Sequence, residues 1–201
     1  MLWLASAPLV LASKSAIRRT LLETAGVSIE VRPADIDERG IETKSSMQAP
    51  DAVAALLARE KASAIARSMP GRLVLGADQV LGLGNQRFSK PNDRAAARVQ
   101  LRALSGRTHA LYSAVVFVQD GEVLFEHIGI ARLTMRTFSD RFLDDYLDAV
   151  GETAMASVGA YQLEGLGIQL FDHVEGDYFT VLGLPLLPAL DFLRRHGSLA
   201  R

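Results

Sequence analysis

A dipeptide near the middle of the chain, Asp120-Gly121, restricts the fold more than any other short segment. It lies between two long runs of strand-type residues, 107–119 and 122–134. A two-residue connection of this composition is typical of a tight hairpin turn, and a turn that short joins only antiparallel strands. The sequence therefore predicts a long antiparallel pair of strands in a central sheet.

The rest of the chain alternates between strand and helix patterns, with glycine, proline and capping residues at the boundaries. Alternation early and hairpins late favour an α/β fold with a mixed, twisted sheet flanked by helices. We expect a loop over 33–49 and a second hairpin at Val174–Tyr178. The other expected strands are 9–12, 28–31 and 72–83, and the expected helices are 16–25, 50–69, 93–104, 139–150 and 185–196.

Composition excludes several classes of protein. The chain has 201 residues, 49% of them apolar, and a net charge of −1. That length suits one large domain or two small lobes that share a core. The charge gives no reason to expect nucleic acid as a partner. With no cysteine, neither disulfides nor thiolate metal sites can form. The start lacks a basic segment, and no apolar run is long enough to span a membrane, so we expect a soluble, cytoplasmic protein.

Asp78 is the most informative candidate for a functional residue. It follows Gly76-Ala77 inside the apolar segment 72–81, and Lys90-Pro91 comes twelve residues later, after a loop with two glycines. Burying a carboxylate in such a segment is costly unless it is paired or bound to a metal. The pattern suits metal-assisted phosphate chemistry, and the alternative is a turn aspartate that caps the next element.

The segment that runs from Leu11 to Arg19 is a second candidate. A strand ends, Ser13 and Ser15 follow, and a helix begins with Arg18 and Arg19 in its first turns. Free amides at a helix N-terminus bind anions, and arginine binds phosphate with two parallel hydrogen bonds. The alternative is a serine cap with two solvated arginines.

Three further segments contain charged residues that are candidates for a functional site. Asp35–Glu38 is an acidic cluster that would usually be solvated surface, and Lys61 lies along the apolar stripe of the helix expected over 50–69. A lysine there either reaches the rim of the core or points into a cleft. Glu164 stands among glycines in Ser157–Gly167, and glycines allow close approach of the backbone to a ligand.

Taken in order, these segments resemble the motifs of the Maf family of nucleoside triphosphate pyrophosphatases, the septum-formation inhibitor homologues. The resemblance covers residues 9 to about 196 and implies a single Maf-like domain over 1–201, with two lobes and a central cleft. The matching segments are Leu11–Arg18, Asp37-Glu38, Arg59–Ala62, Gly76–Val80, Lys90-Pro91, Leu104–His109, Gly159–Gly165 and Val181–Leu186.

The resemblance also implies roles for particular residues. The family cleaves the α–β bond of nucleoside triphosphates with a divalent cation such as Mg²⁺, Mn²⁺ or Co²⁺. Asp78 would activate water, and Asp78 with Glu38 would hold the ion. Lys61 and Lys90 would balance charge in the catalytic step. The expected substrate-binding residues are Ser13, Arg18 and Glu38.

The subfamilies of this family differ at three positions that bear on the choice of base. They are Ile17, Gln79 and Glu164. Gln79 and Glu164 resemble the 7-methyl-GTP subfamily, whereas Ile17 stands where that subfamily has a large aromatic residue. Because an ionised Glu164 only accepts hydrogen bonds, the pattern favours a purine or modified base over dTTP or UTP.

Two other functions are compatible with the resemblance. One is a nucleotide-binding regulator of septum formation without significant catalysis, which intact Asp78, Lys61 and Lys90 argue against. The other is the ITP/XTP house-cleaning pyrophosphatases, which lack the opening Leu-Ala-Ser motif. Whether the chain forms a homodimer is left open.

Overall fold

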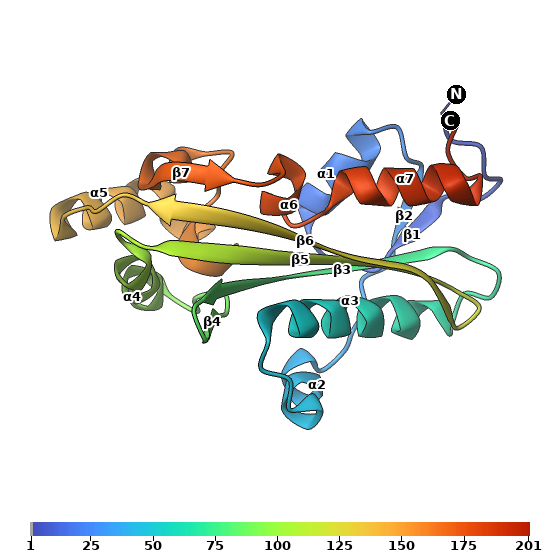
Figure 1. Cartoon of the computed structure of the whole chain (residues 1–201), viewed down its shortest axis with the longest axis horizontal. Helices are drawn as coiled ribbons and strands as arrows, with labels where there is room; N and C mark the ends of the chain where they lie inside the picture. Colours follow the sequence, from blue (N-terminus) through green and yellow to red (C-terminus); the bar gives the residue numbers. More distant parts are fainter. Residues whose placement is uncertain (1) are drawn as a thin grey trace. The chain divides into compact units, whose positions relative to one another are not determined.

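The computed structural model describes residues 2–201 and confirms the mixed α/β fold (Figure 1). The strands are β1 (Leu9–Leu11), β2 (Ile29–Val31), β3 (Val74–Leu83), β4 (Gln86–Phe88), β5 (Thr108–Gln119), β6 (Glu122–Met135) and β7 (Phe171–Glu175). The α-helices are α1 (Ala16–Thr24), α2 (Glu38–Ser45), α3 (Pro50–Ala66), α4 (Arg94–Leu104), α5 (Asp140–Val150), α6 (Tyr178–Val181) and α7 (Leu186–His196). Three short 3₁₀ helices are η1 (Gly151–Met155), η2 (Val158–Ala160) and η3 (Leu166–Leu170).

All seven strands belong to one mixed sheet. Its order is β2-β1-β3-β5-β6-β7, and β4 pairs with β3 away from this path. Strand β1 runs parallel to β2 and to β3, whereas the β3–β4 and β6–β7 pairs are antiparallel. Parallel neighbours need a crossover, and the segments that contain α1, α2 and α3 supply it.

The hairpin predicted at Asp120-Gly121 is confirmed. Strand β5 ends at Gln119 and β6 begins at Glu122, so the two residues form the whole connection. Their φ angles are 50° and 84°. A two-residue turn of the I′ type needs positive φ at both positions, because its twist matches that of the strands. Aspartate tolerates this conformation and glycine adopts it freely.

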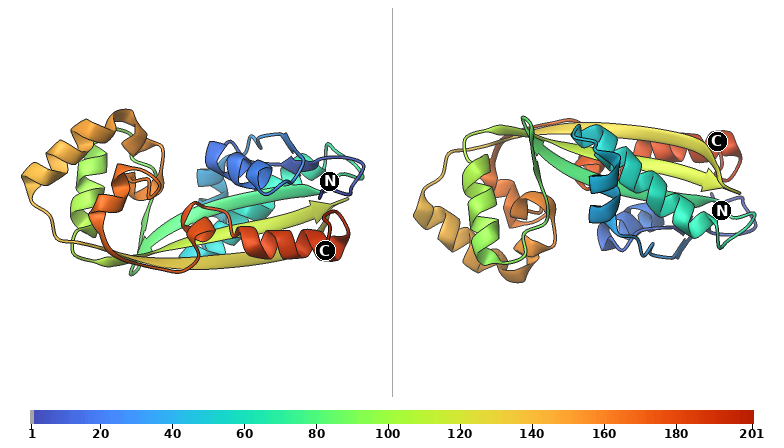
Figure 2. Two further views of the ribbon diagram at one scale, coloured as in Figure 1. Left: turned by 90° about the horizontal axis from the view of Figure 1, so that it is seen from above. Right: turned by 90° about the horizontal axis from the view of Figure 1, so that it is seen from below.

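The chain divides into two compact units, and the first holds the chain up to Gln79, Tyr112–Gly129 and Asp177–Arg201. In this unit α3 lies on one face of the strands, and α1 and α7 lie on the other (Figure 2). Burial of apolar side chains from both layers holds the unit together. Its core includes Leu9, Leu11, Leu22, Leu75, Val115, Phe117, Phe192 and Leu193.

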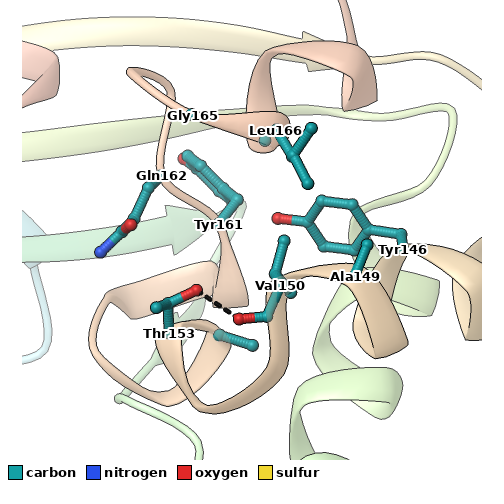
Figure 3. Close-up of a pocket in the computed structure, with 10 residues that line it drawn as sticks. Tyr146, Ala149, Val150, Thr153, Tyr161, Gln162, Gly165 and Leu166 are labelled. Carbon is teal, nitrogen blue, oxygen red and sulfur yellow. Dashed lines mark hydrogen bonds between the residues drawn. The ribbon is translucent and has the colours of Figure 1, made fainter.

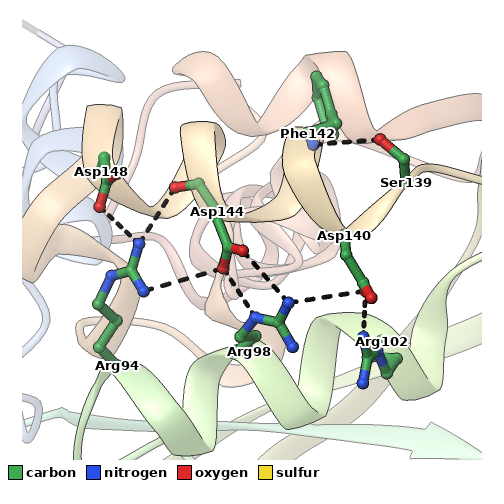
Figure 4. A network of polar contacts seen from close by, with 8 residues as sticks. All are labelled: Arg94, Arg98, Arg102, Ser139, Asp140, Phe142, Asp144 and Asp148. Carbon is green, nitrogen blue, oxygen red and sulfur yellow. Dashed lines mark hydrogen bonds and ion pairs between the residues drawn. The ribbon is translucent and has the colours of Figure 1, made fainter.

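The second unit consists of Val80–Leu111 and Ile130–Gly176. Its helices α4 and α5 carry arginines and aspartates at matching four-residue intervals, which face each other in Figure 4. Arg98 binds Asp144 through two nitrogens, at 2.7 and 3.2 Å. Arg102 pairs with Asp140 and Arg94 with Asp148. Opposite charges on facing turns favour one alignment of the two helices.

Two expectations about secondary structure were wrong. The segment 33–49, expected to be a loop, contains α2, whose N-cap Asp37 accepts a hydrogen bond from the amide of Gly40. The second hairpin does not form, because Asp177 instead caps α6 by accepting from the amide of Thr180. The helix expected over 50–69 ends at Ala66. Among residues 2–201, no helix combines the length and apolar character that crossing a membrane would require.

Candidate active site

The candidate site forms around Asp78 in the first unit, on strand β3. The strand is buried along nearly all its length, and Asp78 itself is only 8% exposed. Burial raises the pKa of the Asp78 carboxyl, although the positive charges of Lys61 and Arg18 act in the opposite direction. Asp78 is therefore a desolvated carboxylate with a greater affinity for protons than an ordinary aspartate.

Gly76 brings helix α3 onto this strand. A Cβ atom at position 76 would overlap the carbonyl oxygen of Ala58 and lie within 3 Å of Ala62. Only glycine permits such a close approach of a helix backbone. The approach places the third and fourth turns of α3 directly beside the residues that lead to Asp78.

Lys61 of α3 joins two carboxylates. Its Nζ atom lies 2.6 Å from Asp78 Oδ1 and 2.9 Å from Glu38 Oε1. The Lys61 side chain is 12% exposed and the Glu38 side chain 47% exposed. The lysine thus points inward, and Glu38 reaches it from the first turn of α2. One ammonium compensates a buried and a partly solvated carboxylate.

Arg18 and Ser13 lie next to Asp78 but are bound mainly to the protein itself. Arg18 donates from Nε to the carbonyl oxygen of Gly183 at 2.8 Å, and from Nη1 to Ala77 O at 2.8 Å and to Ser13 Oγ at 3.1 Å. Burial lowers the pKa of the Arg18 guanidinium below its ordinary value, although the charges of Asp78 and Glu38 act in the opposite direction. These three hydrogen bonds do not use its remaining nitrogen, Nη2.

Two specificity candidates belong to this unit. Ile17 is half-buried in the first turn of α1. Gln79 follows Asp78 on β3, and its Nε2 donates to Ser113 Oγ at 2.9 Å and to the carbonyl oxygens of Thr180 and Val181 at 3.2 and 3.0 Å. The donor end of the Gln79 amide is therefore held by protein acceptors.

Lys90 and Glu164 belong to the second unit. Lys90 is exposed between β4 and α4, and Glu164 is exposed in the glycine-containing segment before η3. Of the predicted site residues, the first unit brings together Ser13, Arg18, Glu38, Lys61, Asp78 and Gln79.

The donor set fits a hard divalent cation that keeps most of its water. Within residues 2–201, no group of three or more histidine, aspartate or glutamate side chains is arranged to hold a metal. Asp78 and Glu38 nevertheless converge on a single cation, the Lys61 ammonium. Two carboxylates completed by water and substrate phosphates are a common arrangement for Mg²⁺, so these residues suit such an ion.

The second unit contains a pocket of about 280 Å³ whose lining includes Tyr146 and Tyr161 (Figure 3). Tyr161 is buried there, with its hydroxyl 2.7 Å from His109 Nε2, and Tyr146 donates to Ala160 O. Burial lowers the pKa of His109 to about 4 and raises that of Tyr146 to about 12, so this wall is uncharged near neutrality. The lining residues are Tyr146, Ala149, Val150, Thr153, Ala154, Tyr161, Gln162, Gly165, Leu166 and Gly167.

Sequence reasoning missed Ser113. It is fully buried on β5 and bound to Gln79. The only available signal was a serine that precedes the apolar run 114–118, and small hydroxyl residues are common in strands.

Several known proteins are similar to this chain. The family model described as Maf-like protein matches residues 8–196. A nucleoside triphosphate pyrophosphatase from Rhodopseudomonas palustris is 56% identical over 199 residues, which are 99% of this chain and 98% of that protein. A 7-methyl-GTP pyrophosphatase from Rhizobium etli is 52% identical over 193 residues, or 95% of this chain and 97% of that protein. A solved dITP/XTP pyrophosphatase from Mycobacterium abscessus is 16% identical, with a TM-score of 0.42 and coverage of 96% and 94%.

Proposed function

Because this chain belongs to the Maf family, we propose that it is a nucleoside triphosphate pyrophosphatase that hydrolyses the bond between the α- and β-phosphates. The products are a nucleoside monophosphate and pyrophosphate. The observation that carries the proposal is the buried Asp78 carboxylate, held 2.6 Å from the Lys61 ammonium. A pure binding protein would need anion ligands but no desolvated proton acceptor.

Asp78 acts as the general base. Its raised pKa makes it a better proton acceptor than an exposed aspartate, and efficiency is greatest when a base titrates near the working pH. Asp78 takes a proton from a water molecule, and the oxygen of that water attacks the α-phosphorus. The bond to the β-phosphate oxygen breaks, and pyrophosphate leaves.

The cationic groups stabilise the negative charge that develops on the phosphates. Lys61 and Lys90 supply this charge in the catalytic step. Arg18 contributes Nη2, and Ser13 contributes its hydroxyl, beside the N-terminus of α1. Glu38 keeps Lys61 in place through the 2.9 Å ion pair.

Asp78 and Glu38 would hold a divalent cation, Mg²⁺, Mn²⁺ or Co²⁺. Such an ion, when bound, neutralises phosphate charge and lowers the pKa of coordinated water. Asp78 keeps its role as the proton acceptor in this arrangement.

Pyrophosphate release from a panel of canonical and modified triphosphates with each metal tests this function. Asp78→Asn should lower kcat by about 10²–10⁴-fold, since the nearly isosteric amide cannot take a proton. Asp93→Asn is the matched control, because Asp93 caps α4 and asparagine caps equally well. Turnover by Asp78→Asn within a few-fold of the control would remove Asp78 from the base role.

We propose that the preferred base is a purine or modified base such as 7-methylguanine. Ile17, Gln79 and Glu164 are the specificity positions. An ionised Glu164 accepts hydrogen bonds only, which suits bases with N–H donors. The Rhizobium etli relative named 7-methyl-GTP pyrophosphatase, 52% identical, supports this direction.

Glu164→Gln tests the choice of base. The amide can also face carbonyl acceptors, so kcat/KM for GTP-type substrates should fall relative to that for UTP-type substrates. Loss by the same factor for every substrate would show that Glu164 serves its glycine-rich segment instead. We further propose that residues 1–201 act as a single Maf-like domain that cleanses nucleotide pools in the cytoplasm.

A further inference from the structure

Ser113 is the one polar residue of β5 that the structure buries completely. It is followed by the fully buried Ala114, Val115 and Val116. Burial of an unsatisfied hydroxyl would be unfavourable, so its hydrogen-bond partners determine what it does.

The Ser113 hydroxyl lies between an amide donor and a carbonyl acceptor. It donates to Thr180 O at 2.8 Å and accepts from Gln79 Nε2 at 2.9 Å. Because the hydroxyl proton is committed to Thr180, only its lone pairs face the Gln79 side chain. An amide oxygen at that position would meet a lone pair, which is unfavourable.

Two backbone carbonyls reinforce the same orientation. Gln79 Nε2 also lies 3.2 Å from Thr180 O and 3.0 Å from Val181 O. Three acceptors therefore surround one end of the amide, and that end must be the NH₂ group. The Gln79 Oε1 atom is turned away from them.

The segment that supplies these carbonyls is fixed at its other end by Arg18. The guanidinium links Ala77 O of β3 to Gly183 O. Gly183 has φ 91°, and a Cβ there would lie 3.5 Å from Arg18 Nη2 and 3.6 Å from Gln79 Cδ. The residues on both sides of Asp78 are thus tied to one turn, 180–183.

We propose that Ser113 is a positioning residue that fixes the polarity of the Gln79 amide and thereby contributes to base selectivity. Ser113 touches no substrate in this scheme. It keeps the Gln79 NH₂ group on the protein, so that the amide offers a substrate only its acceptor, Oε1. The substrate class that this orientation favours has N–H donors on the base edge. The inference rests on the proposed pyrophosphatase function and on Gln79 as a specificity position.

The test is a double-mutant cycle on selectivity, with GTP and UTP as probes and the ratio of their kcat/KM values as the readout. Ser113→Ala removes one of the three acceptors that hold the Gln79 NH₂ group, so the ratio should fall about five- to tenfold, the effect of one hydrogen bond. Gln79→Ala should lower the ratio at least as much. In the Gln79→Ala background, Ser113→Ala should change it by less than about twofold, because the two residues act as one unit.

Ser198→Ala is the matched control. Ser198 is a buried serine of the same unit whose hydroxyl lies 2.7 Å from His196 Nδ1. Its loss should leave the ratio unchanged. Should Ser113→Ala fail to fold, Ser113→Thr keeps the hydroxyl and should retain the wild-type ratio.

Several results would overturn the inference. These are an equal loss for both substrates in Ser113→Ala, an additive change of the ratio in the double variant, or a shift by Ser113→Thr as large as that by Ser113→Ala. Pyrophosphate release by the wild-type protein tests the proposed reaction separately from the selectivity role of Ser113. Release with an unchanged ratio in Gln79→Ala would leave the reaction standing and refute the selectivity role of both residues.

Discussion

Replacement of Lys61 by methionine should destabilise the protein in a pH-dependent manner. Methionine keeps most of the volume but removes the ammonium that lies 2.6 Å from Asp78 Oδ1. Both side chains are nearly buried, at 12% and 11% exposed. Removal of one partner from a buried ion pair typically costs about 3–5 kcal/mol, because the other charge is left uncompensated.

Two features reduce this cost here. Arg18 still attracts the Asp78 carboxylate, and Asp78 can take up a proton. We therefore expect a smaller loss, about 2–3 kcal/mol at pH 8. For a chain of this length, that corresponds to a fall in Tm of roughly 5–10 °C.

The sign of the pH dependence follows from the pKa of Asp78. Burial raises this pKa and Lys61 lowers it, so Lys61→Met raises it further. The penalty is complete where Asp78 would be charged and shrinks as the pH falls through its pKa in the variant, because a neutral carboxyl needs no ammonium.

Thermal unfolding followed by circular dichroism from pH 5 to pH 9 measures this effect. In an Asp78→Asn background the same lysine replacement should cost much less, since no carboxylate remains at position 78. A penalty of equal size at both ends of the pH range, and undiminished in the Asp78→Asn background, would refute the electrostatic argument.

Three other expectations concern stability. Asp78→Asn alone should lower Tm less than Lys61→Met does, because the Lys61 ammonium keeps its 2.9 Å ion pair with Glu38; an equal fall in Tm for the two variants would contradict this. His109→Gln should lose less stability in acid than the wild type. Burial lowers the pKa of His109 from 6.5 to about 4, so the wild type loses on the order of 3 kcal/mol of folding stability as the pH falls between those values. An equal fall in Tm from pH 7 to pH 4.5 in the wild type and in the variant would contradict this. Arg98→Met should lower Tm by a few degrees at most in dilute buffer and by less in 1 M NaCl, since salt screens its exposed pair with Asp144; a loss that persists in high salt would indicate packing instead.

The parts of the fold that depend on local chemistry were predictable from the sequence. The turn at Asp120-Gly121 needs only two residues with positive φ, and a long apolar segment predicts β3. Helix α2 was missed because it buries none of its residues and therefore shows no apolar period. Its position depends on the Asp37 cap and on the ion pair of Glu38 with Lys61, and this ion pair is a tertiary contact.

The candidate site shows the same division. The residue types at Asp78, Lys90 and Arg18 indicated phosphate chemistry from the sequence. The sequence could not show that most of the Arg18 guanidinium is used by Ala77, Gly183 and Ser13. Nor could it show Ser113, whose partners lie 34 and 67 residues away.

The close packing at Gly76 has a consequence for any attempt to redesign this enzyme. Gly76 has no group that could meet a nucleotide, yet it determines how far Lys61 stands from Asp78, because α3 rests on the bare backbone there. Even Gly76→Ala would push the helix outward and lengthen a 2.6 Å contact. The distance between Lys61 and Asp78 is therefore set by a residue that takes no part in the reaction. Attempts to change the substrate range should alter other side chains and keep the contact between α3 and β3 at Gly76 unchanged.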